Sequence, residues 1–98
     1  MKNFTNIFVA PVAMLSTAHI TKEDGARLLH GPVPAAVIYR SSEGALIHIF
    51  KFIDPDKEFD DFSEAFRDIV KKLNEDGYSY VRFDEVFPTI SELPTFDW

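Results

Sequence analysis

Two runs rich in β-branched and aromatic residues place the strongest constraint on the fold. Ala35–Arg40 and Ala45–Phe52 are rich in Val, Ile, Tyr and Phe, and Ser41-Ser42-Glu43-Gly44 lies between them. Runs of this composition form strands, and a connection of this length is typical of a hairpin. Alternate residues of the second run are largely apolar on both faces: Leu46, His48, Phe50 and Phe52 on one, and Ile47, Ile49 and Lys51 on the other. We therefore predict a hairpin whose second strand is central in a sheet.

An apolar run near the N-terminus predicts another strand. It contains Ile7, Phe8, Val9, Val12, Met14 and Leu15. The run is too continuous for simple alternation, which favours a strand covered on both faces. Pro11 interrupts it and lacks the amide donor of a central ladder, so the strand begins after Pro11, bulges there, or lies at a sheet edge. We favour a strand near Val12–Ser16.

The next segment predicts a short helix. Thr21, followed three residues later by Asp24, approximates a capping box, and Glu23 adds a second acid at the positive end of the helix dipole. Gly31 suits the left-handed position after a helix, and Pro32 prevents continuation. We expect about nine residues of helix. Its inward side chains are predicted to be Ala26, Leu28 and Leu29.

A second helix is predicted after the hairpin. Asp54 is expected to cap it with Pro55 at the first helical position, although Asp56 or Asp60 are alternative caps. Apolar residues at intervals of three or four make a core-facing stripe of about four turns. The stripe consists of Phe59, Phe62, Phe66, Ile69, Val70 and Leu73. Gly77 is predicted to close the helix.

The last predicted strand is Tyr78–Val86, a long one in which residues alternate in part. Tyr80, Arg82 and Asp84 fall on one side, and Ser79, Val81 and Phe83 on the other. The tail Phe87–Trp98 contains too much proline for regular structure, yet it is apolar enough that we expect it to pack along the domain.

The predicted order of strand, helix, strand, strand, helix, strand matches a ferredoxin-like α+β fold, in which two helices cover one face of an antiparallel sheet. The chain has 98 residues, of which 46% are apolar and 14% aromatic. A chain of this length and composition can form one hydrophobic core without disulfides or structural metals, so we expect a single domain over residues 1–98. Such a fold hosts many unrelated activities and assigns none of them.

Composition excludes several classes of site and partner. The chain has no cysteine, which removes disulfides and thiolate chemistry and suits a reducing cytoplasm. A net charge of −6 argues against direct binding to nucleic acid, because no basic surface would release counterions. No apolar stretch is long enough to span a bilayer and no leader pattern opens the chain, so we expect a soluble, unprocessed protein without a membrane partner. We also expect no cofactor.

The densest charge lies near the predicted second helix. This segment contains six acids and one basic residue, Lys57. The acids are Asp54, Asp56, Glu58, Asp60, Asp61 and Glu64. An EF-hand loop is excluded, because Phe59 stands where that loop needs glycine. These acids form either a solvated helix face or a negative surface that imitates nucleic-acid phosphates and binds a basic protein. Phe96 and Trp98 are either an aromatic anchor for a partner or part of the protein's own packing.

Hydroxyls and an imidazole at the end of the first strand suggest a second kind of site. Ser16 or Thr17 with His19 would make a nucleophile and a base, although their hydroxyls can equally satisfy turn amides. No third residue or nucleophile elbow accompanies them. His19, His30 and His48 lack a short metal-ligand spacing, so no metal site is predicted.

The two ends of the chain carry a family resemblance. Ser16-Thr17-Ala18-His19-Ile20-Thr21, followed by Leu28-Leu29, and the closing Leu93-Pro94-Thr95-Phe96-Asp97-Trp98 resemble the signatures of an uncharacterised bacterial family, DUF5983. This resemblance implies a small bacterial or phage protein encoded on mobile elements near anti-restriction and toxin-antitoxin genes. The family has no established activity, so the resemblance transfers no catalytic residue.

Together with the mobile-element origin that the resemblance implies, the acidic surface favours a small protein-binding module that inhibits a host defence or nucleic-acid-binding complex, in the manner of an anti-restriction or anti-CRISPR protein. The acidic segment Asp54–Glu64 would be its contact with a basic partner. One alternative is a small hydrolase that uses His19 with Ser16 or Thr17. Another is a structural homodimer joined through sheet edges or the aromatic tail.

Overall fold

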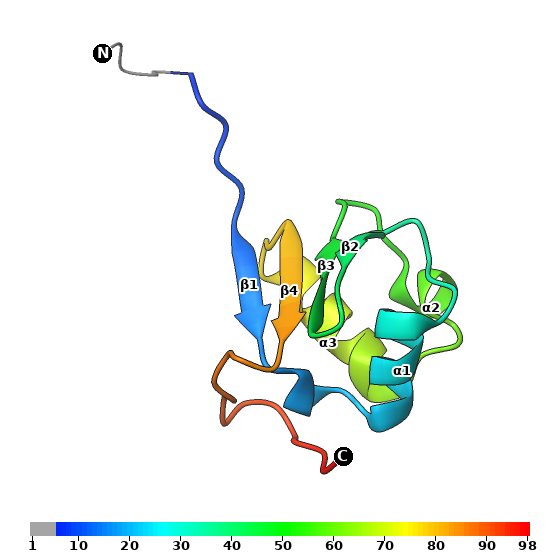
Figure 1. Cartoon of the computed structure of the whole chain (residues 1–98). Helices are drawn as coiled ribbons and strands as arrows, with labels where there is room; N and C mark the ends of the chain where they lie inside the picture. The colour runs from blue at the N-terminus through cyan, green and yellow to red at the C-terminus, as the bar shows by residue number, and fades with distance from the viewer. Residues whose placement is uncertain (1–5) are drawn as a thin grey trace.

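The computed structural model describes residues 6–98 and contains one four-stranded sheet. Its strands are β1 (Val12–Leu15), β2 (Val37–Arg40), β3 (Gly44–His48) and β4 (Tyr80–Asp84), in the order β1-β4-β3-β2 (Figure 1). The predicted α+β class is confirmed. One feature differs from a fully antiparallel sheet: β1 and β4 are parallel, whereas the other two strand pairs are antiparallel. The sheet is therefore mixed.

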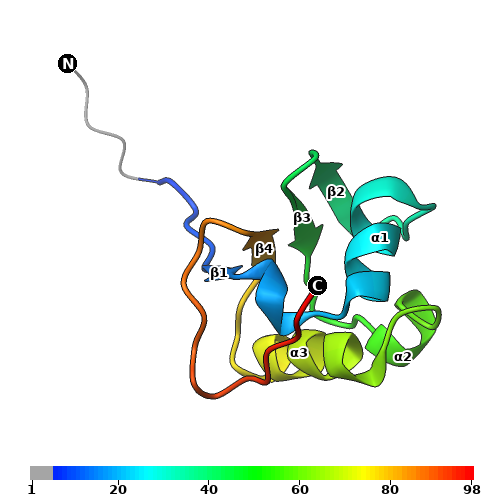
Figure 2. The same ribbon diagram turned by 60° about the horizontal axis from the view of Figure 1, so that its bottom comes forward.

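The helices lie on one side of this sheet. They are α1 (Lys22–His30), α2 (Pro55–Glu58) and α3 (Glu64–Glu75), and a single 3-10 turn, η1 (Thr17–His19), precedes them. Figure 2 shows all three α-helices on the same side of the strands. Residues such as Ala13, Ile47 and Phe83 are buried on that side, whereas the other face of the sheet stays open.

The predicted hairpin is confirmed, and β3 is central, with β2 on one side and β4 on the other. The Ser41 amide donates to the Gly44 carbonyl at 2.8 Å and closes the connection. Both strands are shorter than the apolar runs that predicted them. The pairing shifts between Val37 and Tyr39, where a bulge interrupts the ladder of β2.

The first strand begins directly after Pro11, as one of the predicted alternatives required, and it lies at the sheet edge. The expectation that both of its faces are covered was wrong. Ala13 and Leu15 are buried, whereas Val12 is 40% and Met14 57% exposed, because no helix lies on the open face of the sheet.

The capping box of α1 is confirmed. The Thr21 hydroxyl accepts the Asp24 amide at 3.0 Å, and an Asp24 carboxylate oxygen accepts the Thr21 amide at 3.1 Å. Of the three side chains expected to point inward, Leu28 is fully buried, Leu29 is half-buried and Ala26 is exposed. Gly31 ends the helix but with φ −88° and ψ 177°, so the left-handed conformation was wrong. A residue that precedes proline is restricted to extended backbone, and Pro32 imposes this here.

The predicted second helix is divided in two, which corrects the sequence interpretation. Asp54 caps α2 with Pro55 at its start, as predicted, but α2 ends at Glu58 and α3 begins only after Ser63. The Ser63 amide donates to a carboxylate oxygen of Asp24 at 2.7 Å instead of extending a helical ladder. The Ser63 hydroxyl then accepts the Phe66 amide at 3.1 Å and caps α3.

The apolar stripe still faces the core, although it begins in the loop that follows α2 and continues along α3. Phe59, Phe62 and Phe66 pack together, with ring centroids 4.5 to 5.4 Å apart, and Phe66 lies 5.8 Å from Phe83 of β4. Each buried ring contributes about 2–3 kcal/mol of hydrophobic stabilisation. Aromatic packing therefore holds α3 against the sheet.

The chain leaves α3 through Gly77, whose φ of +87° confirms the predicted stop. The last strand is shorter than the predicted Tyr78–Val86, because a turn follows Asp84. The Asp84 carboxylate accepts the Val86 amide at 3.1 Å, and the Asp84 carbonyl accepts the Phe87 amide at 3.3 Å. The tail then returns past η1 and α3 to end near α1 (Figure 2).

Candidate functional site

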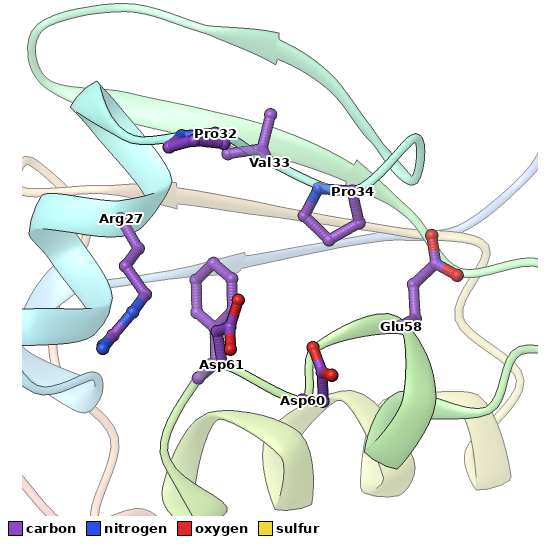
Figure 3. Close-up of a pocket in the computed structure, with 8 residues that line it drawn as sticks. Arg27, Pro32, Val33, Pro34, Glu58, Asp60 and Asp61 are labelled. Carbon is purple, nitrogen blue, oxygen red and sulfur yellow. The ribbon is translucent and has the colours of Figure 1, made fainter.

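A cleft rimmed by acids lies between the α1–β2 connection and the segment that joins α2 to α3. Its volume is about 320 Å³. Pro32, Val33 and Pro34 form one wall, and Glu58, Asp60 and Asp61 project from the opposite side (Figure 3). Arg27 of α1 stands at one end, and the Phe62 ring also lines the cleft. We refer to this site as the acidic cleft.

The wall formed by residues 32–34 is held in place by hydrogen bonds to the backbone carbonyls at its two ends. The Arg40 guanidinium of β2 donates to the Gly31 carbonyl, and the Val37 amide donates to the Pro34 carbonyl at 3.0 Å. Two prolines restrict the backbone between these points. The wall is consequently stiff without belonging to a helix or a strand.

The opposite wall is held by a buried carboxylate. Asp24 of α1 is fully buried, and its oxygens accept the Ser63 amide at 2.7 Å and the Ser63 hydroxyl at 2.5 Å. Ser63 directly follows Phe62, and Asp24 lies one helical turn before Arg27. The same interaction that divides the predicted helix therefore fixes the α2–α3 segment of the acidic cleft relative to α1, which carries Arg27.

The structure separates the six predicted acids into different roles. Asp54 caps α2 by accepting the Asp56 amide at 3.2 Å. Asp56 lies 2.9 Å from the Lys71 ammonium and 3.5 Å from Arg67 Nε of α3. The hydrogen bond with Asp56 is the main cause that raises the pKa of Lys71 above its ordinary value. Asp54 thus caps α2, and Asp56 neutralises cations of the protein itself.

Glu58, Asp60 and Asp61 have neither role, because within residues 6–98 they cap no helix and form no ion pair. All three line the acidic cleft, together with the guanidinium of Arg27. Glu64 is exposed at the start of α3 and lines a different depression with Asp68. The structure therefore brings three of the six predicted acids into one site.

The residues of the alternative hydrolase hypothesis have structural roles in the folded chain. The Ser16 hydroxyl accepts the Ala18 amide at 3.1 Å and caps η1, and Thr17 is buried beside it. His19 is fully buried. Its Nδ1 lies 2.8 Å from the Pro94 carbonyl, and its Nε2 accepts the Ile90 amide at 3.0 Å. Both ring nitrogens hold the tail, so His19 could act as a base for Ser16 only after the tail had left.

The predicted aromatic anchors also contact the protein itself. Trp98 Nε1 donates to the Ile20 carbonyl at 3.1 Å, and the Phe96 amide donates to the Ala18 carbonyl at 2.8 Å. The indole covers Gly25 so closely that a Cβ there would lie 2.6 Å from Trp98 Cη2. Phe96 and Trp98 line a separate depression of about 420 Å³ and not the acidic cleft.

The histidines do not converge. His30 is exposed at the end of α1, whereas half-buried His48 stacks on Tyr80 on the open face of the sheet, with centroids 5.0 Å apart. Within residues 6–98, no group of three potential ligands is arranged to hold a metal ion.

Sequence reasoning missed the non-acidic half of the cleft. Arg27 lies three residues after Asp24 and shares its side of α1, but nothing local indicates that α1 approaches the acidic segment. Pro32 was interpreted only as the residue that prevents the helix from continuing, and Val33 and Pro34 were given no role. One signal was available, since Ser63 is a strong N-cap residue within the apolar stripe and favours a helix start there.

Comparisons with known proteins bear on the family alone. Residues 12–98 match the model described as "Family of unknown function (DUF5983) C-terminal domain". No curated protein and no solved structure matches the chain. None of the helices described in residues 6–98 has the length and apolar character needed to cross a membrane.

Proposed function

Since this chain belongs to the DUF5983 family, for which no function is known, we propose from its geometry that it is a protein-binding module whose acidic cleft holds a basic side chain of a partner. The carrying observation is the cleft itself, where Glu58, Asp60 and Asp61 face an apolar wall without a cation of their own apart from Arg27. Three carboxylates against one guanidinium leave the site negative.

The shape of the cleft favours a lysine or arginine side chain as the group that enters. Such side chains bury an apolar stem along hydrophobic surface while the charged head stays near water or a carboxylate. Phe62, Pro32 and Pro34 offer apolar surface for the stem, and the acids stand at the rim for the head (Figure 3). A volume of about 320 Å³ is at the lower end for ligand sites, which suits one long side chain better than a cofactor.

The overall charge supports the same kind of partner. A net charge of −6 raises the rate at which a basic surface meets the protein, and this effect weakens as salt is added. Strongly basic surfaces are typical of proteins that bind nucleic-acid phosphates. The partner class proposed here is therefore a nucleic-acid-binding complex, including the host defence complexes that an anti-restriction or anti-CRISPR inhibitor from a mobile element would occlude.

The decisive experiment compares two charge reversals that change the net charge equally. The cleft variant carries Glu58→Lys, Asp60→Lys and Asp61→Lys. The control carries Glu64→Lys, Asp68→Lys and Glu75→Lys, all exposed positions on α3 outside the cleft. Asp56 is left unchanged in both, because it pairs with Lys71. Each protein is used for affinity capture from a bacterial lysate at low and moderate salt.

The proposal expects a basic complex to be retained by the wild type and the control, with salt weakening both, and to be lost by the cleft variant. Titration of ¹⁵N-labelled protein with an Arg- and Lys-rich peptide should shift amide signals at residues 58–62 and Arg27. Equal loss in both variants would show a response to total charge alone and would overturn the assignment to the cleft. Retention by the cleft variant would overturn it as well.

A further inference from the structure

The outer edge of β1 borders an apolar groove. β1 pairs with β4 only, so the other side of the strand has no partner among the described strands. A groove of about 620 Å³ runs beside it, bounded by α3 and the returning tail. Its apolar lining includes Ala13, Leu15, Ile69, Leu73, Tyr78 and Leu93. An open strand edge beside an apolar groove is a site where another strand adds.

The segment just before β1 is apolar and uncovered. Ile7 is 63%, Phe8 88% and Val9 81% exposed, and this stretch extends away from the sheet (Figure 1). A tight two-residue turn back onto β1 of its own chain would be strained. A two-residue hairpin turn at Ala10-Pro11 would place Ala10 at positive φ, a conformation that no described residue except Gly77 adopts.

We propose that the groove beside β1 is filled by residues 7–10 of a second copy of this chain, which lie antiparallel to β1 while the first copy fills the groove of the second. The exchange is reciprocal, so a two-fold axis relates the copies. This exchange buries an exposed apolar segment in an open apolar groove, and every copy of the chain has both. It is independent of the acidic cleft, whose residues take no part in it.

The backbone defines the register. The Pro11 carbonyl accepts the Ser79 and Tyr80 amides at 3.0 and 3.3 Å, so Pro11 directs its polar backbone toward β4. Backbone groups alternate along a strand, and those of Val12 and Met14 therefore point to the free edge. In the proposed register, Val12 pairs with Ala10 of the second copy and Met14 pairs with its Phe8. The two Pro11 residues then lie opposite each other. Pro11 then lies in a non-hydrogen-bonded pair, where its missing amide proton costs nothing.

This register also directs the correct side chains into the groove. Residues directly opposite in an antiparallel pair project from the same face. Val9 and Ile7 of the second copy lie opposite Ala13 and Leu15, which face the helices, and so they enter the groove toward Ile69 and Leu73. A shift by one residue would direct them to the open face instead.

Disulfide cross-linking through one introduced cysteine tests the position of the two-fold axis, because the chain has no cysteine of its own. Across a non-hydrogen-bonded pair the two Cα atoms are about 4.5 Å apart, within the range a disulfide spans. Pro11→Cys should therefore form a disulfide-linked dimer rapidly under mild oxidation. Val86→Cys, at a position that is 75% exposed and distant in sequence from the segment, is the control for random collision. Equal cross-linking of both variants would overturn the register.

Sedimentation equilibrium tests the occupant. The wild type should have twice the chain mass of 11.2 kDa at high concentration, and Ile7→Asp with Val9→Asp should return it to the monomer mass. Both positions are exposed and outside every strand and helix, so the variant should keep its circular dichroism. The matched control Ile38→Asp, on the opposite edge strand, should remain dimeric. A monomeric wild type, or a dimer that survives the double substitution, would refute the proposal.

Discussion

The buried carboxylate of Asp24 is predicted to be the most costly side chain to remove outside the aromatic core. It accepts three hydrogen bonds that belong to the start of two helices: from the Thr21 amide at 3.1 Å, the Ser63 amide at 2.7 Å and the Ser63 hydroxyl at 2.5 Å. In Asp24→Ala the two amides lose a buried acceptor, and α1 loses the acid near its positive end.

The magnitude follows from these donors. A hydrogen bond to a charged group contributes about 1.5–3 kcal/mol, although bonds that share one acceptor do not add fully. We expect Asp24→Ala to lower the free energy of unfolding by about 3–5 kcal/mol, a large part of the roughly 5–15 kcal/mol typical of a domain. Asp24→Asn keeps one carbonyl acceptor but no charge, so its loss should be about half as large.

Urea denaturation followed by circular dichroism measures both values. Glu23→Ala is the matched control, because Glu23 is the neighbouring acid in the first turn of α1 and is exposed. Glu23→Ala should lower the free energy of unfolding by only about 0.3–1 kcal/mol, the usual effect of a charge near a helix end. If Asp24→Ala and Glu23→Ala were equally stable, the buried network would not hold α1 to α3 and the reasoning would be refuted.

Two further predictions concern glycines. In Gly25→Ala, the new Cβ displaces the indole of Trp98 and breaks its hydrogen bond to the Ile20 carbonyl. The gain of about 1 kcal/mol in helix propensity offsets the loss of this bond, so the free energy of unfolding should change little, while the fluorescence emission of the only tryptophan shifts to the red. An unchanged emission spectrum would contradict this packing. Gly77→Ala should lower the free energy of unfolding by about 1 kcal/mol because of the φ of +87° alone, since no other atom lies within 4 Å of a Cβ at this position. Gly77→Asn should lower it less. Equal urea midpoints for the wild type and both variants would contradict this.

Features that depend on a few adjacent residues were predictable. The Thr21 capping box, the Asp54-Pro55 helix start, the hairpin around Ser41–Gly44 and the stop at Gly77 all appear where the residues indicated. In each case the interaction connects groups within four residues, so local chemistry is enough to select the conformation. The apolar stripe likewise predicted which side chains are buried.

Two predictions failed because a distant residue competes for a local bond. The acidic segment reads as one helix because its apolar period is continuous, yet Asp24, thirty-nine residues earlier, takes the Ser63 amide and divides it. His19 shows the same limit. Its place in the sequence suggested a base, but the tail brings the Pro94 carbonyl and the Ile90 amide to its two ring nitrogens.

Composition, helix caps, turns and the α+β order follow from this sequence, because propensity and periodicity act between near neighbours. The acidic cleft, the open edge of β1 and the division of the acids into paired and unpaired sets depend on the folded chain. Each arises where elements far apart in sequence meet. The cleft lies between α1 with the α1–β2 connection and the α2–α3 segment, the open edge results from the pairing of β1 with β4, and the paired acid Asp56 joins α2 to α3. A buried carboxylate or imidazole takes the partners that the fold brings to it, and no local pattern names those partners.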